Sequence, residues 1–389
     1  MKRNFFFPVI CALSLLGGAG CKSYVDAVGG GGDGGSGGSG GTGGDDGTTS
    51  TTTDSTASNT PVNNGCAPDD AASTEAELIV AGKAGALAAD DAWVFFVGEE
   101  SVPYRVPVCG GTPVPVVPAD GIGNGSGAAL IALDATHVYW TAYQTFPNFE
   151  LWRAPKEGGT PELLTDKVGP NNSSPAAIAV DDQFVYFSQP DIFNSNDDPD
   201  KLQGVIRRVP KAGGPVEDLA SGYSLTLAVD SSFLYWARLN QDGTGSVIRA
   251  GKDGSSPTPI ATELGPTDGF SAAGDRLFWT YTDAGVFSLR TSENGGAPLT
   301  LGTTDTYVGP PAATQDAIYW IRPGDTTSGA VFRLATDGTL TQLAEAPASP
   351  NAPFFFGAYG ARVAVNSNAV FWSYEGAAGG APRIYRVAR

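Results

Sequence analysis

The chain has 389 residues with 53 glycines and 28 prolines, whereas charged residues make up only 16% of it. Many turn formers and few charges favour a fold of many short strands and speak against a helical one. The formal net charge of −18 argues against a nucleic-acid partner, because binding to phosphates needs clustered lysine and arginine.

The first twenty residues have the architecture of a secretory signal peptide, and residues 1–20 are predicted to be one. Lys2 and Arg3 precede an apolar stretch, and small residues then lead directly into Cys21. Small residues before a cysteine resemble a bacterial lipobox, which predicts that Cys21 is lipidated. The alternative is ordinary secretion without a lipid on Cys21. With lipidation, we expect a bacterial cell-envelope protein, at the outer membrane or cell surface, that contacts the membrane through its lipid anchor only.

Residues 21–74 are predicted to form the lipidated N-terminus and a disordered linker. Gly, Ser and Thr dominate this segment, which has no lysine or arginine after Lys22. Such a composition cannot bury enough apolar surface to offset the entropy cost of ordering the chain. The linker therefore separates the anchor from a folded domain, which we expect over residues 75–389.

One pattern recurs seven times in residues 75–389. It consists of a short apolar run, a turn that often starts with Asp, and an aliphatic residue followed by two aromatic residues. Copies of about 40–50 residues with four short strands each are typical of β-propeller blades. The sequence thus predicts an all-β fold, a seven-bladed β-propeller of four-stranded antiparallel blades. The aliphatic residues that mark the copies are Val94, Val138, Val185, Leu234, Leu277, Ile318 and Val370.

The paired aromatic residues are interpreted as core residues. Neighbouring residues on a strand point to opposite faces of its sheet, and in a propeller adjacent blades cover both faces of each blade. Both members of a pair can therefore be buried. The recurrent Asp is predicted to accept hydrogen bonds from the backbone N–H groups of its turn.

The seventh copy ends without a fourth strand, whereas an additional strand-like run, 77–80, precedes the first copy. We expect residues 77–80 to pair with residues 384–387. This N-terminal strand would complete the seventh blade beside the C-terminal strand and close the ring without an open edge.

Tyr139-Trp140-Thr141 resembles the YWTD repeat of propellers of the low-density-lipoprotein-receptor type. Similar phrases are Tyr235-Trp236-Ala237, Phe278-Trp279-Thr280, Tyr319-Trp320-Ile321 and Phe371-Trp372-Ser373. The resemblance covers roughly residues 75–389, although those receptor propellers have six blades and the final Asp of the motif is missing here. Members of that family are non-catalytic binding modules, so the resemblance implies a binding domain and no enzymatic activity.

Two of the four cysteines, Cys66 and Cys109, lie outside the predicted signal and anchor. An exported protein is in a compartment that permits disulfides. Cys109 falls in a predicted turn of the first blade, and Cys66 precedes the closing strand next to that blade. A disulfide between them would clamp the closure of the ring. The alternative is two free thiols.

The connections between predicted strands differ in length on the two faces of the propeller. With strands a to d in chain order, the a–b and c–d turns on one face are short, whereas the b–c and d–a connections on the other are long and varied. Long loops on a rigid scaffold often carry function, so we predict that they bind a protein or a glycan. The three consecutive phenylalanines among them could instead plug the central channel. The candidate aromatic residues are Tyr143, Phe146, Phe149, Phe193, Phe354, Phe355 and Phe356.

An acidic loop and the single histidine are the remaining chemical candidates. The loop offers the carboxylate and amide oxygens that Ca²⁺ prefers, but it lacks the Gly and Glu of an EF-hand, and the alternative is a solvated loop. The candidate calcium ligands are Asp191, Asn194, Asn196, Asp198 and Asp200. His137 is interpreted as structural. No other cofactor is predicted.

The favoured interpretation is a monomeric, non-catalytic module of the cell envelope that binds a protein or a glycan. One alternative is a propeller lyase or hydrolase that resembles seven-bladed streptogramin lyases. Such an enzyme would need a general base and a divalent metal, for which a single histidine is poor material. Another alternative is a purely structural envelope protein.

Overall fold

The computed structural model describes the greater part of the chain after Ala72. The described residues are 72, 74–81, 86–97, 102–118, 130–145, 148–166, 176–191, 203–222, 224, 226–239, 244–263, 267–283, 286–304, 311–322, 329–346, 363–374 and 383–389. They form strands and turns, and none of them lies in a helix. A search of this part for an apolar helix of membrane-spanning length finds none. The predicted signal peptide and Cys21 lie outside these residues.

The strands form seven four-stranded antiparallel sheets, the blades. Blade 1 is β2 (Leu87–Ala89), β3 (Trp93–Val97), β4 (Pro103–Pro107) and β5 (Val114–Pro115), and blade 2 is β6 (Ile131–Leu133), β7 (His137–Thr145), β8 (Asn148–Pro155) and β9 (Glu162–Thr165). Blade 3 is β10 (Ala177–Val180), β11 (Phe184–Asp191), β12 (Gln203–Pro210) and β13 (Glu217–Ser221), and blade 4 is β14 (Leu227–Val229), β15 (Phe233–Leu239), β16 (Gly245–Gly251) and β17 (Thr258–Glu263). Blade 5 is β18 (Thr267–Ala273), β19 (Arg276–Asp283), β20 (Val286–Glu293) and β21 (Leu299–Thr304), and blade 6 is β22 (Ala312–Thr314), β23 (Ala317–Arg322), β24 (Gly329–Ala335) and β25 (Leu340–Ala346). Blade 7 is β26 (Val363–Val365), β27 (Ala369–Tyr374) and β28 (Arg383–Ala388), completed by β1 (Glu77–Ala81).

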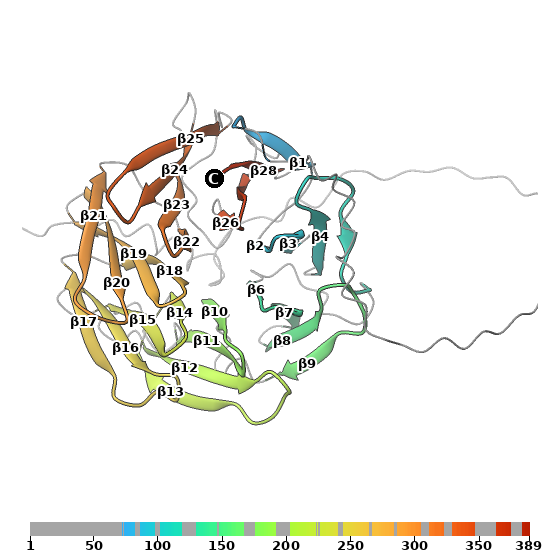
Figure 1. Cartoon of the computed structure of the whole chain (residues 1–389). Coiled ribbons are helices and arrows are strands. Elements are labelled where there is room, and N and C mark those ends of the chain that lie inside the picture. The colour runs from blue at the N-terminus through green and yellow to red at the C-terminus, as the bar shows by residue number, and fades with distance from the viewer. Residues whose placement is uncertain are drawn as a thin grey trace, which may run out of the picture. The chain divides into compact units, whose positions relative to one another are not determined.

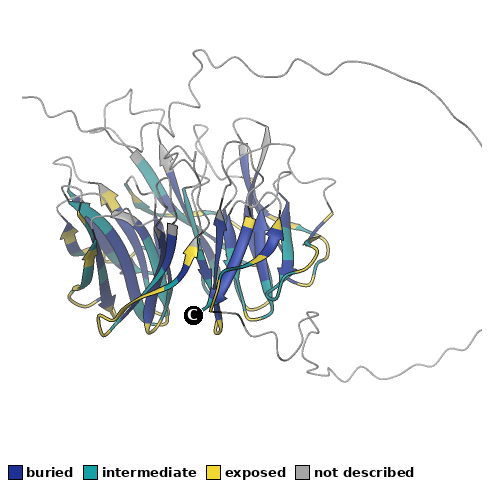
Figure 2. Ribbon diagram, turned by 90° about the horizontal axis from the view of Figure 1, so that it is seen from above, coloured by how far each residue is buried: buried dark blue, intermediate teal, exposed yellow. Residues whose placement is uncertain are grey.

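The blades are arranged in a ring, with the first strand of each blade innermost and the fourth outermost (Figure 1). The strand interiors are buried between neighbouring blades, and exposed turn residues line one end of the ring (Figure 2). The predicted seven-bladed β-propeller is therefore confirmed.

The N-terminal strand closes the ring as predicted. β1 pairs antiparallel with β28, with Leu78 opposite Tyr385 and Ala81 opposite Arg383. Because β1 comes from the opposite end of the domain sequence, the last blade cannot form until both ends of the domain have met. The sheet order β1-β28-β27-β26 gives blade 7 the same four strands as the others.

Both members of each aromatic pair are buried, one on each face of the blade. Tyr139 packs against Val185 and Phe187 of the following blade, whereas Trp140 packs against Phe95 of the preceding blade. Neither Tyr139 nor Trp140 is exposed to solvent. At roughly 25 cal/mol per Å² of apolar surface, each buried ring stabilises the fold by several kcal/mol. The interpretation of these residues as core is confirmed.

A β-bulge interrupts the outermost strand of six blades. In each bulge one aliphatic residue has no partner in the neighbouring strand and packs into the core between its own blade and the next. A bulge breaks the regular edge that another strand would need for pairing, so the rim of the ring is protected against strand addition. The bulged residues are Ile79, Leu164, Leu219, Ile260, Leu301 and Leu343.

The bulge in β1 gives a direct test of ring closure by side-chain packing. Ile79 is 6% exposed and packs against blade 1, whereas its neighbour Leu78 is 50% exposed. We expect Ile79→Ala to lower the free energy of unfolding by about 2–4 kcal/mol, because it leaves a cavity between blades 7 and 1. Leu78→Ala should change it by no more than about 0.5 kcal/mol. Urea denaturation measures both, and equal effects would contradict the packing described here.

Candidate functional site

The two ends of the ring differ in their chain connections. At one end, here called the short-turn end, two or three residues join the first strand of a blade to the second, and four to six join the third to the fourth. At the other, the loop end, residues 116–130 join β5 to β6, residues 192–202 join β11 to β12, and residues 347–362 join β25 to β26. The predicted binding face corresponds to the loop end.

Most of the candidate aromatic residues at the loop end lie outside the described residues, namely Phe146, Phe193, Phe354, Phe355 and Phe356. Tyr143 belongs to β7, with its side chain not described. The prediction that Phe149 lies on the binding face is wrong. Phe149 belongs to β8, is 9% exposed and packs against Leu151 and Leu164 in the core between blades 2 and 3. Phe149 pairs with Tyr143 in the hairpin of β7 and β8, so it is a core residue of a strand and not a loop residue.

Most of the candidate calcium ligands lie outside the described residues. Asp191 ends β11, whereas Asn194, Asn196, Asp198 and Asp200 lie outside the described residues. The part of the chain that the structure describes contains no group of three or more His, Cys, Asp or Glu side chains that could hold a metal ion. The Ca²⁺ site stays a prediction.

Cys109 lies in the turn after β4, at the short-turn end of blade 1. It is disulfide-bonded. Cys66 lies outside the described residues, so the pairing Cys66–Cys109 stays a prediction. A disulfide at this turn would join the chain that precedes β1 to the blade against which β1 packs.

At the short-turn end, the recurrent Asp organises the turn between the first two strands. Asp134 Oδ1 accepts hydrogen bonds from the backbone N–H groups of Thr136 and His137, both at 2.7 Å. Asp134 Oδ2 accepts the hydroxyl of Tyr139 at 2.7 Å. Asp181 and Asp230 make the same three contacts in blades 3 and 4, and Asp90 makes the two backbone contacts in blade 1. The predicted turn role of Asp is confirmed, and the tyrosine contact adds to it.

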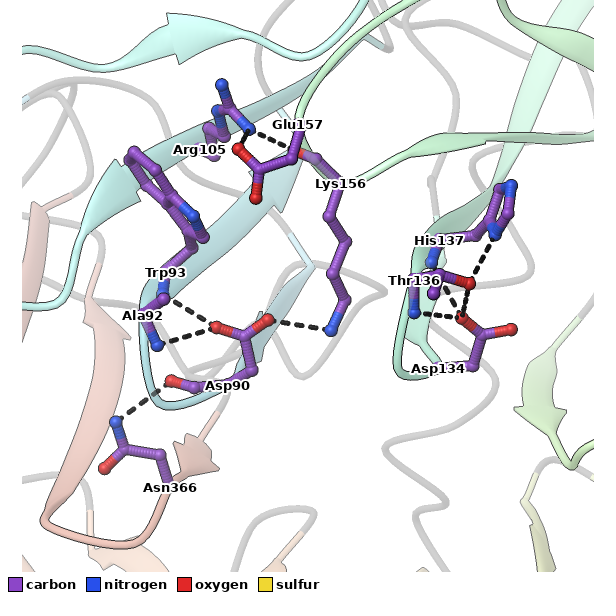
Figure 3. Close-up of polar contacts among 10 residues, drawn as sticks. All are labelled: Asp90, Ala92, Trp93, Arg105, Asp134, Thr136, His137, Lys156, Glu157 and Asn366. Atoms are coloured by element: carbon purple, nitrogen blue, oxygen red, sulfur yellow. Dashed lines mark hydrogen bonds and ion pairs between the residues drawn. The ribbon is translucent and has the colours of Figure 1, made fainter. Parts of the chain in front are cut away.

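Each of three such aspartates also pairs with a lysine of the following blade. Lys156 Nζ lies 2.7 Å from Asp90 Oδ2, Lys252 Nζ lies 3.0 Å from Asp181 Oδ2, and Lys211 pairs with Asp134. The carboxylate thus joins its own turn to the next blade (Figure 3). We call each of these ion pairs between neighbouring blades a rung.

The rung between blades 2 and 3 determines the protonation of its carboxylate. Burial alone would raise the pKa of Asp134, but the Lys211 ammonium, the Tyr139 hydroxyl and two backbone N–H groups lower it well below the usual range of an aspartate. Burial and the neighbouring carboxylate of Asp134 raise the pKa of Tyr139. Tyr139 therefore stays protonated and acts as a hydrogen-bond donor rather than as a base.

Arginines of the third strands reinforce several junctions. Arg105 stacks on Trp93, with its guanidinium carbon 4.5 Å from the ring centre, and donates to the Lys156 carbonyl and to Glu157 of blade 2. Arg208 and Arg249 repeat this arrangement by stacking on Phe184 and Phe233 and donating to backbone carbonyls of the next blade. These contacts fix neighbouring blades relative to one another at the short-turn end.

His137 begins β7, directly after the first turn of blade 2 at the same end. Its Nδ1 is 2.8 Å from the hydroxyl of Thr136 (Figure 3). The centre of its ring is 6.2 Å from that of the Tyr139 ring. Among the described residues, no second titratable group is in hydrogen-bonding contact with the imidazole. The arrangement agrees with the interpretation of His137 as a structural residue.

A shallow groove of about 470 Å³ lies at the rim between blades 3 and 4. Its floor includes Trp236, Ile248 and Pro259, which lie opposite one another on neighbouring strands of blade 4, and β13 forms its wall. The bulge at Leu219 breaks the regular edge of β13. The groove is therefore poorly suited to strand addition.

No family model and no curated protein matches this chain. Solved structures share its fold at low identity. Oligogalacturonate lyase from Vibrio parahaemolyticus is 10% identical, with 80% of this chain and 91% of that chain covered and a TM-score of 0.57. Virginiamycin B lyase from Staphylococcus aureus is 12% identical, with 81% and 98% covered and a TM-score of 0.51. Puromycin hydrolase is 14% identical with a TM-score of 0.53, and the match covers 80% of this chain but 52% of that enzyme, about half its length.

At these identities the similarity concerns the fold alone, because one propeller fold carries many unrelated functions. The seven-bladed propeller is thus shared with proteins of several activities. Membership in the YWTD family has no support from a family model and stays a prediction.

The rung between blades 2 and 3 can be tested by removing its cation. Lys211→Met leaves the half-buried Asp134 carboxylate without its ammonium, and we expect the free energy of unfolding at pH 7 to fall by about 1–3 kcal/mol. Glu162→Gln is the control, because Glu162 is 55% exposed in its pair with Arg153 and should contribute less than about 1 kcal/mol. Urea denaturation measures both.

The same variant has a defined pH dependence. The pKa of Asp134 is lower in the folded than in the unfolded chain, so the rung stabilises the fold above the unfolded pKa of about 4 and is lost as the pH falls through the folded pKa. Asp134 titrates alike in the two unfolded chains, so the stability difference between wild type and Lys211→Met should shrink once the pH falls below the folded pKa of Asp134 in the variant, which is higher because the variant lacks the ammonium. An Asp134 pKa that NMR titration finds equal in the folded wild type and the folded variant would rule out an ionic rung.

Proposed function

We propose that this protein is a cell-envelope lipoprotein whose propeller binds a protein or a glycan, without catalysis, through its loop end. The observation that carries the proposal is the difference between the two ends. Turns at the short-turn end are brief and fixed by hydrogen bonds and rungs, whereas the long connections all leave from the opposite strand ends. Variable connections on a fixed scaffold are where binding functions concentrate.

The rest of the ring supports the loop end as the binding surface. The outer strands carry bulges that disfavour strand addition at the rim. At the short-turn end, Lys156, Lys211 and Lys252 are engaged in ion pairs with the neighbouring blade. A partner would gain little there, because it would have to compete with contacts that already hold the blades together.

The chemistry of the described residues favours binding over catalysis. A lyase or hydrolase needs a general base within reach of its substrate. The only histidine, His137, contacts Thr136 at the short-turn end, and Tyr139 is held in its protonated form by Asp134. His137 and Tyr139 are therefore poor candidates for the base of the lyase alternative, which would have to use a carboxylate, a lysine or a residue of the connections at the loop end.

Anchoring through Cys21 is part of the same proposal. It rests on the charged start, the apolar stretch and the small residues before Cys21. The Gly-, Ser- and Thr-rich residues 21–74 would then act as a spacer between the lipid and the propeller. This geometry suits a domain that captures a partner at a distance from the membrane.

The binding test uses the full chain. Glycan arrays and pull-downs from envelope extracts identify a ligand, and its affinity is then measured by calorimetry for two loop-end variants, Phe193→Ala and the triple alanine variant of Phe354, Phe355 and Phe356. We expect at least a tenfold loss of affinity, since truncation of an aromatic anchor typically costs more than about 1.4 kcal/mol.

Thr136→Ala, at the short-turn end, is the matched control and should bind as the wild type does. If the control loses binding while the loop-end variants keep it, the assignment of the binding face is wrong. Turnover of a bound ligand that persists in the loop-end variants but disappears in His137→Ala would instead favour the enzyme alternative.

A further inference from the structure

In the part of the chain that the structure describes, charged rungs connect four pairs of neighbouring blades. Three are the lysine rungs of blades 2, 3 and 4, and the fourth uses Arg389, which lies 3.6 Å from Asp316 of blade 6. Arg389 occupies the lysine position of blade 7. Its backbone N–H donates to Asn368 in the first turn of its own blade, as the backbone N–H of Lys211 donates to Gln183. The rung is thus a repeated device at the short-turn end.

Among the described residues, the junction between blades 5 and 6 lacks the cation of this device, although Asp275 of blade 5 lies at the turn position that Asp316 has in blade 6. In blade 3, an Asp lies five residues before the first aromatic residue of the buried pair. In blade 5, this position is Ala273. In blade 3, Arg208 lies opposite this first aromatic residue on the neighbouring strand, and the equivalent residue of blade 5 is Thr291. The Thr291 hydroxyl donates a hydrogen bond to the Leu277 carbonyl of its own blade at 3.0 Å. At the lysine position, blade 6 has Thr336.

Buried apolar side chains join these two blades, and the side chain of Gln315 of blade 6 also lies against Gly274 in the first turn of blade 5. Phe278 and Leu289 of blade 5 pack against Ile318, Trp320 and Leu334 of blade 6, all of them buried. Apolar burial has no preferred direction, so it resists sliding and tilting of the two blades less than an ion pair or a hydrogen bond does.

Two other junctions also lack the lysine, but both have substitutes. Between blades 4 and 5, Arg249 donates to the Gly295 carbonyl at 2.8 Å, and the buried Glu263 pairs with Arg290 at 3.1 Å. Between blades 7 and 1, Asn366 donates to the Asp90 carbonyl at 3.0 Å, and Arg386 donates to the Val108 carbonyl at 3.0 Å. Among the described residues of the junction between blades 5 and 6, no arginine or asparagine side chain donates to a carbonyl of the neighbouring blade, and no ion pair joins the two blades.

We infer that the ring opens first between blades 5 and 6, and that this seam lets the propeller widen without breaking a charged rung or the β1–β28 closure. The seam is independent of the ligand, and it would serve a binding module and an enzyme alike. Opening there exposes the side chains that face blade 6 from β20, while the equivalent side chains at other junctions stay covered.

Thiol labelling of the full chain tests the seam. Leu289 of β20 faces blade 6, and Leu151 of β8 faces blade 3. The two leucines occupy equivalent positions, because each lies opposite the residue that follows the aromatic pair of its blade. Their side chains are 2% and 0% exposed, respectively. We expect Leu289→Cys to react with a thiol reagent at least tenfold faster than Leu151→Cys under native conditions, with mass spectrometry resolving the labelled site. Equal rates would overturn the inference.

A designed rung provides the second arm. Asp275 is the second residue of the turn between β18 and β19 of blade 5. Asp316 has the same position in the turn between β22 and β23 of blade 6, and it pairs with Arg389 of blade 7. Thr336→Lys should therefore pair with Asp275 and slow the labelling of the cysteine at position 289 several-fold. Adding Asp275→Asn should restore the fast rate. If Thr336→Lys leaves that rate unchanged, the missing rung is not what defines the seam.

Hydrogen exchange of the unmodified chain covers the case in which a cysteine variant fails to fold. The amides of β20 and β22, on either side of the seam, should exchange faster than those of β8 and β10 at the rung between blades 2 and 3. The reverse order would contradict the seam as directly as equal labelling rates.

Discussion

The structure depends on the burial of two consecutive aromatic residues on opposite faces of the same strand. Tyr139 and Trp140 have no exposed surface, and one contacts the following blade while the other contacts the preceding one. A sheet with one face exposed to solvent could bury only one of the two aromatic residues. Repetition of the pair in successive blades therefore requires every blade to have a neighbour on both sides, and a closed ring is the arrangement that gives every blade two.

Ring closure follows from the same constraint. Blade 7 must be as complete as the others, since an incomplete blade would leave the aliphatic core of blade 1 uncovered. β1 supplies the missing strand and inserts Ile79 into that core through its bulge. Polar contacts of the short-turn end then fix neighbouring blades in place. Such an ion pair needs only a lysine or an arginine in one blade, placed next to the Asp of the preceding blade.

Sequence periodicity predicts the blade number, the strand order and the closing strand, because each depends on residues within one repeat or at the two ends of the domain. It does not predict the rungs, since Lys211 and Asp134 belong to different repeats and meet only once the blades pack. The bulges escape prediction because a bulge is defined by the register of two strands. The place of Phe149 in a strand is not predicted either, because polarity and loop length do not reveal how far the hairpin of β7 and β8 extends. The loop-end residues have no repeated pattern from which their positions could be predicted.

The measurement that tests the account most directly is disulfide trapping of the ring closure. Ala81 and Arg383 are both exposed and lie opposite each other in β1 and β28, so cysteines at these positions should form a disulfide in the folded protein without disturbing the core. Ala81→Cys paired with Asp253→Cys, in the exposed turn of blade 4, is the control and should not cross-link within the chain. A closed seven-bladed ring predicts rapid cross-linking of the first pair alone. Failure of that pair to cross-link in folded protein would contradict the closure on which the account rests.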